Sequence, residues 1–149
     1  MTRTIRDALF LRLNRLGGLP LTPHTPLPAG GSYLIALEVE RDLVVTIGAL
    51  GRRGVPRGTY LYAGNARRGL QARIERHLRP TKKRHWHLDH LTSRREVRPL
   101  TALVFTEREV DECSLVAQLL AIPGASVPIP GFGASDCRRG CPAHLVLLA

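Results

Sequence analysis

Runs of apolar residues with strand-like spacing predict three β-strands in the first half of the chain. Residues 33–39 and 43–47 are rich in β-branched and aliphatic side chains, and the short charged connection between them predicts a β-hairpin. Residues 59–63 alternate tyrosines with aliphatic residues, which is the side-chain period of a strand. The glycine- and arginine-rich residues 50–57 are expected to form a loop before this third strand.

Beyond the third strand, the spacing of apolar residues becomes helical. Gly64 is expected to end the strand in a tight turn, because glycine tolerates backbone conformations that other residues avoid. Leu70, Ile74 and Leu78 then share one face of a helix predicted over residues 69–78. A basic loop is expected after this helix.

The second half of the chain is predicted to add a strand at residues 100–105 and a helix at residues 109–121. Residues 123–141, rich in glycine and proline, are expected to form an ordered loop, and residues 144–148 a short apolar strand or a plug in the core. Glu112 falls on the apolar side of the predicted helix, where a carboxylate is costly unless it is paired or bound to a metal ion. A buried ion pair with an arginine and a metal site are the two interpretations.

The N-terminal region differs from the rest of the chain. Residues 1–16 place leucines among arginines and predict a short basic amphipathic helix, and four prolines within residues 19–30 predict an extended linker. The helix could pack on the domain, contact DNA or be a removable targeting segment. The predicted organisation is residues 1–29 as basic helix and linker, followed by one folded domain over residues 30–149.

Charge is concentrated in one part of the chain. The net charge is +10, and residues 67–98 hold eleven Lys and Arg against three acidic residues, whereas residues 99–149 are slightly acidic. A basic stripe over one helix and its following loop is typical of a nucleic-acid binder, although a merely basic protein is the alternative. The candidate nucleic-acid-binding residues are Arg67, Arg68, Arg76, Lys82, Lys83, Arg84, His85 and His87.

The cysteine and histidine positions leave two metal questions open. Three cysteines, an odd number, argue against a closed disulfide framework. Cys137, Cys141 and His144 could form a structural Zn²⁺ site if Cys113 lies near them in space, but a packed loop with free thiols is favoured because the spacing is not that of a standard knuckle. The histidines at 85, 87 and 90 lack helical metal-ligand spacing, so a histidine that reaches a reactive centre is preferred there.

Hydropathy argues against membrane insertion and secretion. No apolar run approaches the roughly 20 residues that a membrane span needs. The N-terminus lacks a long apolar core followed by a small-residue cleavage site. We therefore expect a cytoplasmic protein, associated with the nucleoid if it binds DNA.

Several of these features form an ordered set that resembles the GIY-YIG nuclease superfamily. Gly31-Ser32-Tyr33 matches its first tripeptide and Tyr62-Ala63-Gly64 its second, followed by Arg73, His77 and Glu112. Within the superfamily, the chain is similar to the branch described as domain of unknown function 123, which is sometimes fused to DNA glycosylases of the endonuclease III type. The marks of this branch are residues 62–66, 85–89, 112–113 and 131–137, and the resemblance runs from about residue 30 to the C-terminus.

The resemblance implies an α+β fold with a small central antiparallel sheet, of three strands, flanked by helices. It also implies a metal-dependent endonuclease that hydrolyses phosphodiester bonds in DNA during repair or processing, with Mg²⁺ or Mn²⁺ as cofactor. DNA is the implied partner, RNA is the alternative substrate, and a DNA-repair glycosylase is an implied protein partner. No membrane partner is expected.

The same resemblance implies a role for each of five residues. Tyr33 would be the general base, with His77 helping to lower its pKa. Tyr62 would hold the phosphate or the water by its hydroxyl group. Arg73 would contact phosphate oxygens, and Glu112 would bind the metal ion.

The match departs from the superfamily at two points. The connection between the two tyrosines is longer than usual, and no asparagine follows the glutamate, although Ser135 or Asp136 could replace it. Two other functions therefore stand beside the endonuclease. One is a non-catalytic nucleic-acid-binding module on the same fold, and the other is a zinc-stabilised protein-interaction domain.

Overall fold

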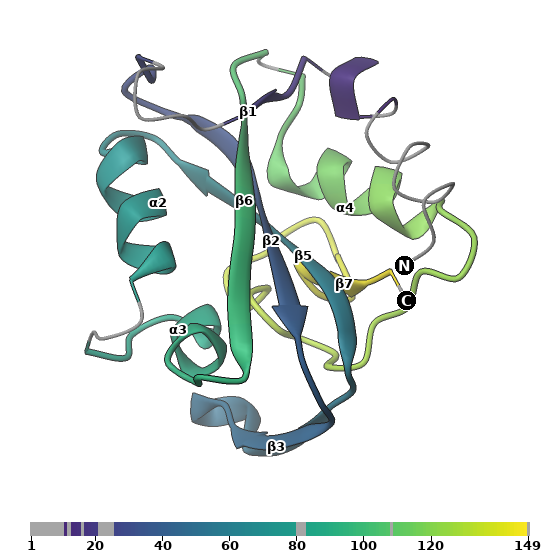
Figure 1. Ribbon diagram of the computed structural model, residues 1–149. Coiled ribbons are helices and arrows are strands. Elements are labelled where there is room, and N and C mark those ends of the chain that lie inside the picture. Colours follow the sequence, from purple (N-terminus) through teal and green to yellow (C-terminus); the bar gives the residue numbers. More distant parts are fainter. Residues whose placement is uncertain are drawn as a thin grey trace.

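The computed structural model describes residues 11, 13–15, 17–20, 26–79, 83–107 and 109–148 (Figure 1). The helix predicted at residues 1–16 lies mostly outside the described residues, as does the middle of the predicted linker. The C-terminal end of the predicted linker leads directly into the first long strand.

The centre of the fold is a five-stranded sheet in which all neighbouring strands are antiparallel. Its strand order is β1 (Leu19–Pro20), β6 (Val97–Phe105), β2 (Gly31–Val39), β5 (Gly58–Ala66) and β7 (Leu145–Leu147). The α+β prediction is confirmed, but the sheet has five strands and not three. The two additional strands are short edge strands, and one of them comes from the predicted linker.

The predicted hairpin between the first two strands is wrong. Strand β3 (Leu43–Thr46) pairs with β4 (Arg52–Val55) in a separate two-stranded sheet, and the 3₁₀ helix η1 (Gly48–Leu50) joins them. Strand β2 instead pairs with β5 on one edge and β6 on the other. The predicted loop thus contains β4, which forms despite its exposed arginines because ladder hydrogen bonds use only the backbone. This second sheet accounts for the long connection between the tyrosines.

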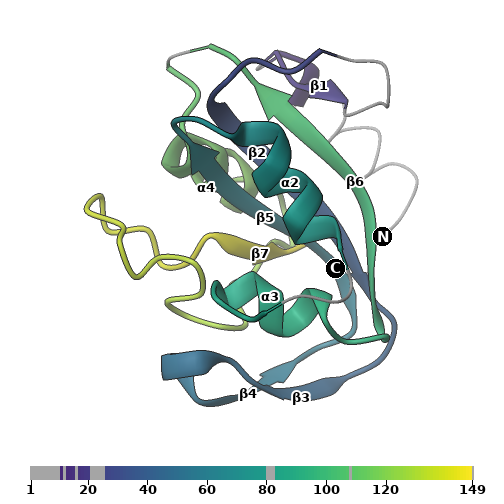
Figure 2. The same cartoon turned by 90° about the vertical axis from the view of Figure 1, so that its left-hand side faces the viewer.

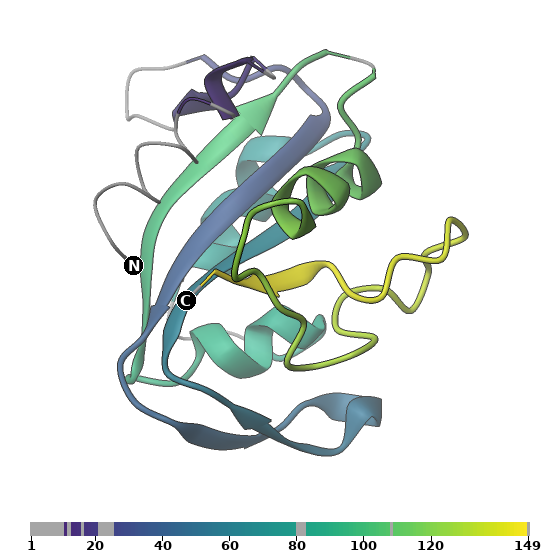
Figure 3. The ribbon, with the colours of Figure 1, turned by 90° about the vertical axis from the view of Figure 1, so that its right-hand side faces the viewer.

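Helices cover both faces of the central sheet. Helices α2 (Leu70–Leu78) and α3 (His87–Thr92) lie on one face (Figure 2), and α4 (Glu112–Leu120) lies on the other (Figure 3). Ile35 packs in the first core layer, whereas its neighbour Leu34 packs in the second. This alternation is the two-residue period of a strand that is buried on both faces.

One helix was not predicted, and another begins at a different residue than predicted. Helix α3 was not predicted, because six residues are too few to display a helical period. Helix α4 begins three residues later than predicted, since Asp111 is its N-cap and accepts a hydrogen bond from the Ser114 N–H at 2.8 Å. This cap places Glu112 in the first turn of the helix.

Gly64 does not end its strand. It lies inside β5, directly opposite Tyr33 in the β2–β5 register, and it has no left-handed backbone conformation. A Cβ atom at this position would lie 2.4 Å from the Cζ and Oη atoms of Tyr33. The glycine is therefore required for space, because the tyrosine ring lies across it.

Candidate active site

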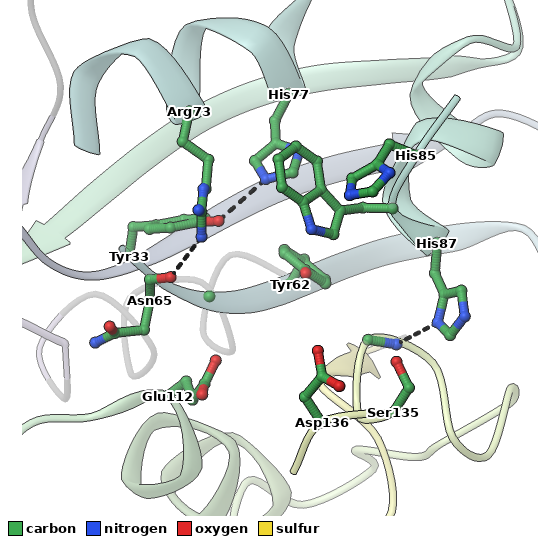
Figure 4. Close-up of a pocket in the computed structure, with 13 residues that line it drawn as sticks. Tyr33, Tyr62, Asn65, Arg73, His77, His85, His87, Glu112, Ser135 and Asp136 are labelled. Carbon is green, nitrogen blue, oxygen red and sulfur yellow. Dashed lines mark hydrogen bonds between the residues drawn. The ribbon is translucent and has the colours of Figure 1, made fainter. Parts of the chain in front are cut away.

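The five residues with expected catalytic roles line one pocket of ≈ 250 Å³ (Figure 4). They come from four elements: β2 and β5 supply the tyrosines, α2 supplies the arginine and histidine, and α4 supplies the glutamate. The pocket lies beside the part of β5 that extends beyond its pairing with β7. Its lining is Tyr33, Tyr62, Gly64, Asn65, Arg73, His77, His85, Trp86, His87, Glu112, Gly133, Ser135 and Asp136.

Strand register brings the two tyrosines together. Tyr33 pairs with Gly64 and Ile35 pairs with Tyr62, so the tyrosines are diagonal neighbours on the same face of the sheet. The Tyr33 and Tyr62 side chains are nearly fully buried. Phe132 packs edge-on against Tyr62, with ring centroids 6.2 Å apart. Both hydroxyl groups are thereby held in fixed positions by packing.

A buried polar chain runs from Tyr33 to Asp89. The Tyr33 hydroxyl lies 3.0 Å from His77 Nε2, and His77 Nδ1 lies 3.9 Å from Asp89 Oδ1. Asp89 is completely buried and accepts hydrogen bonds from the Arg76 guanidinium at 2.9 Å and from two backbone N–H groups. Although burial opposes ionisation of Asp89, these bonds hold its pKa below its usual range. A carboxylate therefore stands behind the His77 ring.

The environment of the tyrosines differs from the expectation. Burial raises the pKa of Tyr33 to about 12, and the nearby Arg73 only partly opposes this. Burial also raises the pKa of Tyr62 strongly. Burial therefore favours the protonated form of both hydroxyl groups, and the Tyr33 hydroxyl shares a hydrogen bond with His77 Nε2. The contact with His77 was expected, but the predicted lowering of the Tyr33 pKa is not found.

Arg73 is fixed on two sides. Its Nη1 donates to the backbone carbonyl of Asn65 at 2.8 Å, and its guanidinium carbon lies 5.0 Å from the centre of the Trp86 ring. Arg76 lies over the same ring at 4.5 Å. Cation–π contacts of this kind orient a guanidinium and leave its edges available for hydrogen bonding. Arg73 therefore presents donors to the pocket.

Glu112 faces the pocket from the first turn of α4, opposite the tyrosines (Figure 4). Its side chain is 35% exposed, so it is not the core carboxylate that the helical pattern suggested. Its Oε2 lies 3.6 Å from His144 Nδ1, and no ion pair to Arg73 exists among the residues that the structure describes. Partial burial raises the pKa of Glu112, and His144 opposes this rise. The carboxylate thus has His144 as an ion-pair partner and is also partly open to a ligand.

The candidate nucleic-acid-binding residues divide into exposed and interior ones. Arg76 and His87 are used within the fold: Arg76 contacts Asp89, and His87 Nδ1 accepts a hydrogen bond from the Gly133 N–H at 2.8 Å. Lys82 lies outside the described residues. The exposed ones directly follow β5 or directly precede α3, and they are Arg67, Arg68, Lys83, Arg84 and His85.

The fold brings all three cysteines together with a histidine. Cys113, in the first turn of α4, lies 3.7 Å from Cys137 (Sγ to Sγ) and 4.0 Å from His144 (Sγ to Nε2). With Cys141 they place four ligand atoms within 4.8 Å of one another, and the cysteines are not joined by disulfides. Backbone N–H groups of Cys141 and Arg139 lower the pKa of the Cys137 thiol to about 6. This Cys₃His cluster could hold a metal ion.

Sequence reasoning gave no site role to several pocket residues. Asp89 is the third residue of α3, and its carboxylate accepts hydrogen bonds from backbone N–H groups just before the helix. An acid at this position of a helix is the only feature of the sequence that could have pointed to it. Trp86 forms a wall of the pocket under two arginines. Gly133 has a left-handed backbone and lies so close to Tyr62 that a Cβ atom would be 2.8 Å from its ring. Ser135 and Asp136 do reach the pocket.

The fold and the pocket together define an α+β domain with a polar pocket, lined in part by Arg73, at the edge of an antiparallel sheet. The sequence profile of one family, Domain of unknown function DUF123, matches residues 32–149. The chain belongs to this family. Comparisons with curated proteins and with solved structures gave no significant match. Among the described residues, no helix combines the length and apolarity needed to cross a membrane.

Proposed function

We propose that this protein is a metal-dependent endonuclease that hydrolyses phosphodiester bonds in DNA during repair or processing. The observation that carries the proposal is the convergence of five polar side chains, from four separate elements, in one pocket. The resemblance of these five positions to the GIY-YIG nucleases supports the same reaction. The pocket is large enough for one phosphodiester group but too small to enclose a nucleotide chain.

Arg73 binds the substrate phosphate in this proposal. Its guanidinium is held by the Asn65 carbonyl and the Trp86 ring, so it is pre-oriented before substrate arrives. A planar guanidinium matches two phosphate oxygens at once, which lysine cannot do. Negative charge that develops on these oxygens during hydrolysis is stabilised by the same contacts.

Tyr33 acts as a proton relay, because its raised pKa leaves almost no tyrosinate at neutral pH. The attacking water transfers its proton to the Tyr33 oxygen while the Tyr33 proton moves to His77 Nε2. The new O–P bond forms as the bond to the leaving oxygen breaks, and the leaving oxygen takes up a proton from solvent water. Asp89 stabilises the imidazolium from its position 3.9 Å from Nδ1. Tyr62 orients the water or the phosphate with its hydroxyl group.

Glu112 is the proposed ligand for the metal ion. One accessible carboxylate, completed by water and phosphate oxygens, is a donor set that suits a hard octahedral cation such as Mg²⁺ or Mn²⁺. A cation bound there would neutralise charge on the phosphate. Asp136 and Ser135 line the same pocket and would bind the outer water molecules of such an ion.

DNA is the proposed substrate and RNA the alternative that experiment must separate. The exposed arginines and lysine beside β5 and α3 supply contacts to the phosphate backbone, which carry affinity but no sequence preference. A DNA-repair glycosylase is a proposed partner, and association with the nucleoid is the proposed location. Both follow from the resemblance.

The test is cleavage of labelled branched, nicked, abasic and single-stranded DNA, and of matching RNA, with Mg²⁺ or Mn²⁺. Arg73→Ala and Glu112→Ala are expected to lower the rate by about 10²–10³-fold, as loss of a transition-state contact does. Glu75→Ala is the matched control, because this exposed acid is hydrogen-bonded to Gln71 and does not line the pocket. Salt-sensitive binding without cleavage, equal in native protein and Glu112→Ala, would exclude the enzyme and leave a nucleic-acid-binding module.

A further inference from the structure

We propose that the Cys₃His cluster is a structural Zn²⁺ site that fixes the C-terminal loop against α4 and contacts Glu112 through His144. Cys113 comes from α4, whereas Cys137, Cys141 and His144 come from the loop that leads into β7. The four ligand atoms lie within 4.8 Å of one another. This site is separate from the Mg²⁺ or Mn²⁺ site proposed at Glu112, and it does not depend on the proposed nuclease activity.

The distances match the coordination geometry of zinc. A tetrahedral ion with Zn–S bonds of about 2.3 Å separates two sulfurs by about 3.8 Å, and a sulfur and a nitrogen by about 3.5 Å. The observed distances are 3.7 Å between the Cys113 and Cys137 sulfurs and 4.0 Å from Cys113 Sγ to His144 Nε2. The widest pair of ligand atoms, within 4.8 Å, would contract by up to about 1 Å when the cluster closes around an ion.

The donor types also select the metal. Three thiolates and one imidazole suit Zn²⁺, whereas Mg²⁺ and Mn²⁺ prefer carboxylate, carbonyl and water oxygens. Four protein ligands leave no open coordination position, which is typical of a structural site and not of a catalytic one. The protein therefore separates a soft-ligand site from the hard-ligand site proposed at Glu112.

His144 connects the two sites. Its Nε2 faces the cysteines, and its Nδ1 lies 3.6 Å from Glu112 Oε2. Zinc at Nε2 would place the imidazole proton on Nδ1, pointing at the carboxylate, which is the carboxylate–histidine–zinc arrangement of many metal sites. Glu112 would then use one oxygen to orient a zinc ligand and keep its other oxygen for the pocket.

The position of the cluster in the fold explains why a cross-link is needed there. Residues 131–144 contain no helix and no strand that the structure describes, yet they supply Gly133, Ser135 and Asp136 to the pocket. The ends of the loop are held by backbone hydrogen bonds, among them the one from the Ala63 N–H to the His144 carbonyl at 2.9 Å. Its middle is tied to the start of α4 by the ion pair between Arg139 and Asp111. Zinc would fix the middle of the loop, and with it one wall of the pocket.

The decisive experiment measures metal on reduced, full-length protein that has been purified without chelators. We expect about one bound zinc per chain, and Co²⁺ substitution should give the intense visible bands of a tetrahedral site together with thiolate-to-cobalt charge transfer. Cys137→Ser and His144→Ala should abolish stoichiometric binding. His90→Asn is the matched histidine control, because this residue lies on α3 near Gly48, and it should bind zinc as the native protein does.

Two further measurements test the fold and the link to Glu112. Removal of zinc should accelerate tryptic cleavage after Arg138 and Arg139, which are exposed between two ligands. Glu112→Gln should keep one zinc but weaken its affinity about 10–100-fold, whereas Glu109→Gln should not. Native protein that takes up no Co²⁺ as a thiolate complex, or that forms a Cys113–Cys137 disulfide and binds no zinc when reduced, would overturn the proposal. These results are independent of whether DNA is cleaved.

Discussion

Replacement of Gly64 by alanine should disturb the centre of the pocket without removing any polar group. The new Cβ atom would lie 2.4 Å from Cζ and Oη of Tyr33 and 2.7 Å from Cε2. Ordinary contacts begin at 3.4 Å, so the ring has to move by about 1 Å. Tyr33 is only 1% exposed, and its hydroxyl hydrogen-bonds His77 at 3.0 Å, so the ring cannot move without breaking packing or this bond.

The expected cost follows from these two effects. Inserting a methyl group into a closely packed site costs about 1–3 kcal/mol. Loss of the tyrosine–histidine hydrogen bond adds about 1 kcal/mol. We therefore expect Gly64→Ala to lower the free energy of unfolding by about 2–4 kcal/mol and to reduce any cleavage rate as strongly as loss of Tyr33 itself.

Urea denaturation followed by circular dichroism measures the first effect, and the cleavage assay measures the second. Gly54→Ala is the matched control, because this glycine also lies in a strand, has an ordinary backbone conformation and has nothing within 4 Å of the added methyl group. The control should be neutral or slightly more stable. If both variants unfold at the same urea concentration, the Tyr33 ring is not confined by Gly64 and the reasoning fails.

Three other predictions concern the polar groups around His77. Tyr33→Phe should abolish cleavage while leaving the fold intact, whereas Tyr60→Phe, which loses only a bond to a backbone carbonyl, should cleave normally. Arg76→Leu should lower the free energy of unfolding at pH 7 by about 3 kcal/mol in urea titrations, because Asp89 keeps a buried charge without its main partner. The pKa of Asp89 is lowered in the folded protein, so its stabilisation is present above about pH 4 and is lost as pH falls through the folded value. Stability of Asp89→Asn should consequently fall less between about pH 5 and pH 2 than that of the native protein, and an equal fall would contradict this assignment.

The sequence predicted those features that depend on local pattern. The strands at residues 33–39 and 59–63 and the helix at residues 69–78 were found because their apolar periods are long and regular. The convergence of Tyr33 and His77 came from the resemblance, since a contact between side chains 44 residues apart leaves no local signal.

Features that depend on tertiary contacts were missed for physical reasons. The partner of β3 was assigned wrongly, because a charged turn signals a reversal of the chain but not which strand will be paired. The role of Gly64 depends on which side chain lies opposite it, and the sequence shows a glycine but not its partner. The raised pKa of Tyr33 depends on how deeply its hydroxyl is buried, which is set by helices far away in the chain. Burial of Asp89 also depends on tertiary packing, so the sequence did not predict it.

The β3–β4 sheet makes the fold modular. Val39 and Gly58 are direct cross-strand partners, so a turn of a few residues could join β2 to β5 without moving either tyrosine. The sheet therefore tolerates a segment of another length between them, and the spacing of the two tyrosines in sequence is not set by the pocket. Simple deletion would still be harmful, since Leu43, Val45 and Val55 belong to the same core as Leu88 and Leu91. An engineer could exchange this segment for another that covers helix α3, and in this way change what the protein presents to a long substrate while keeping the pocket intact.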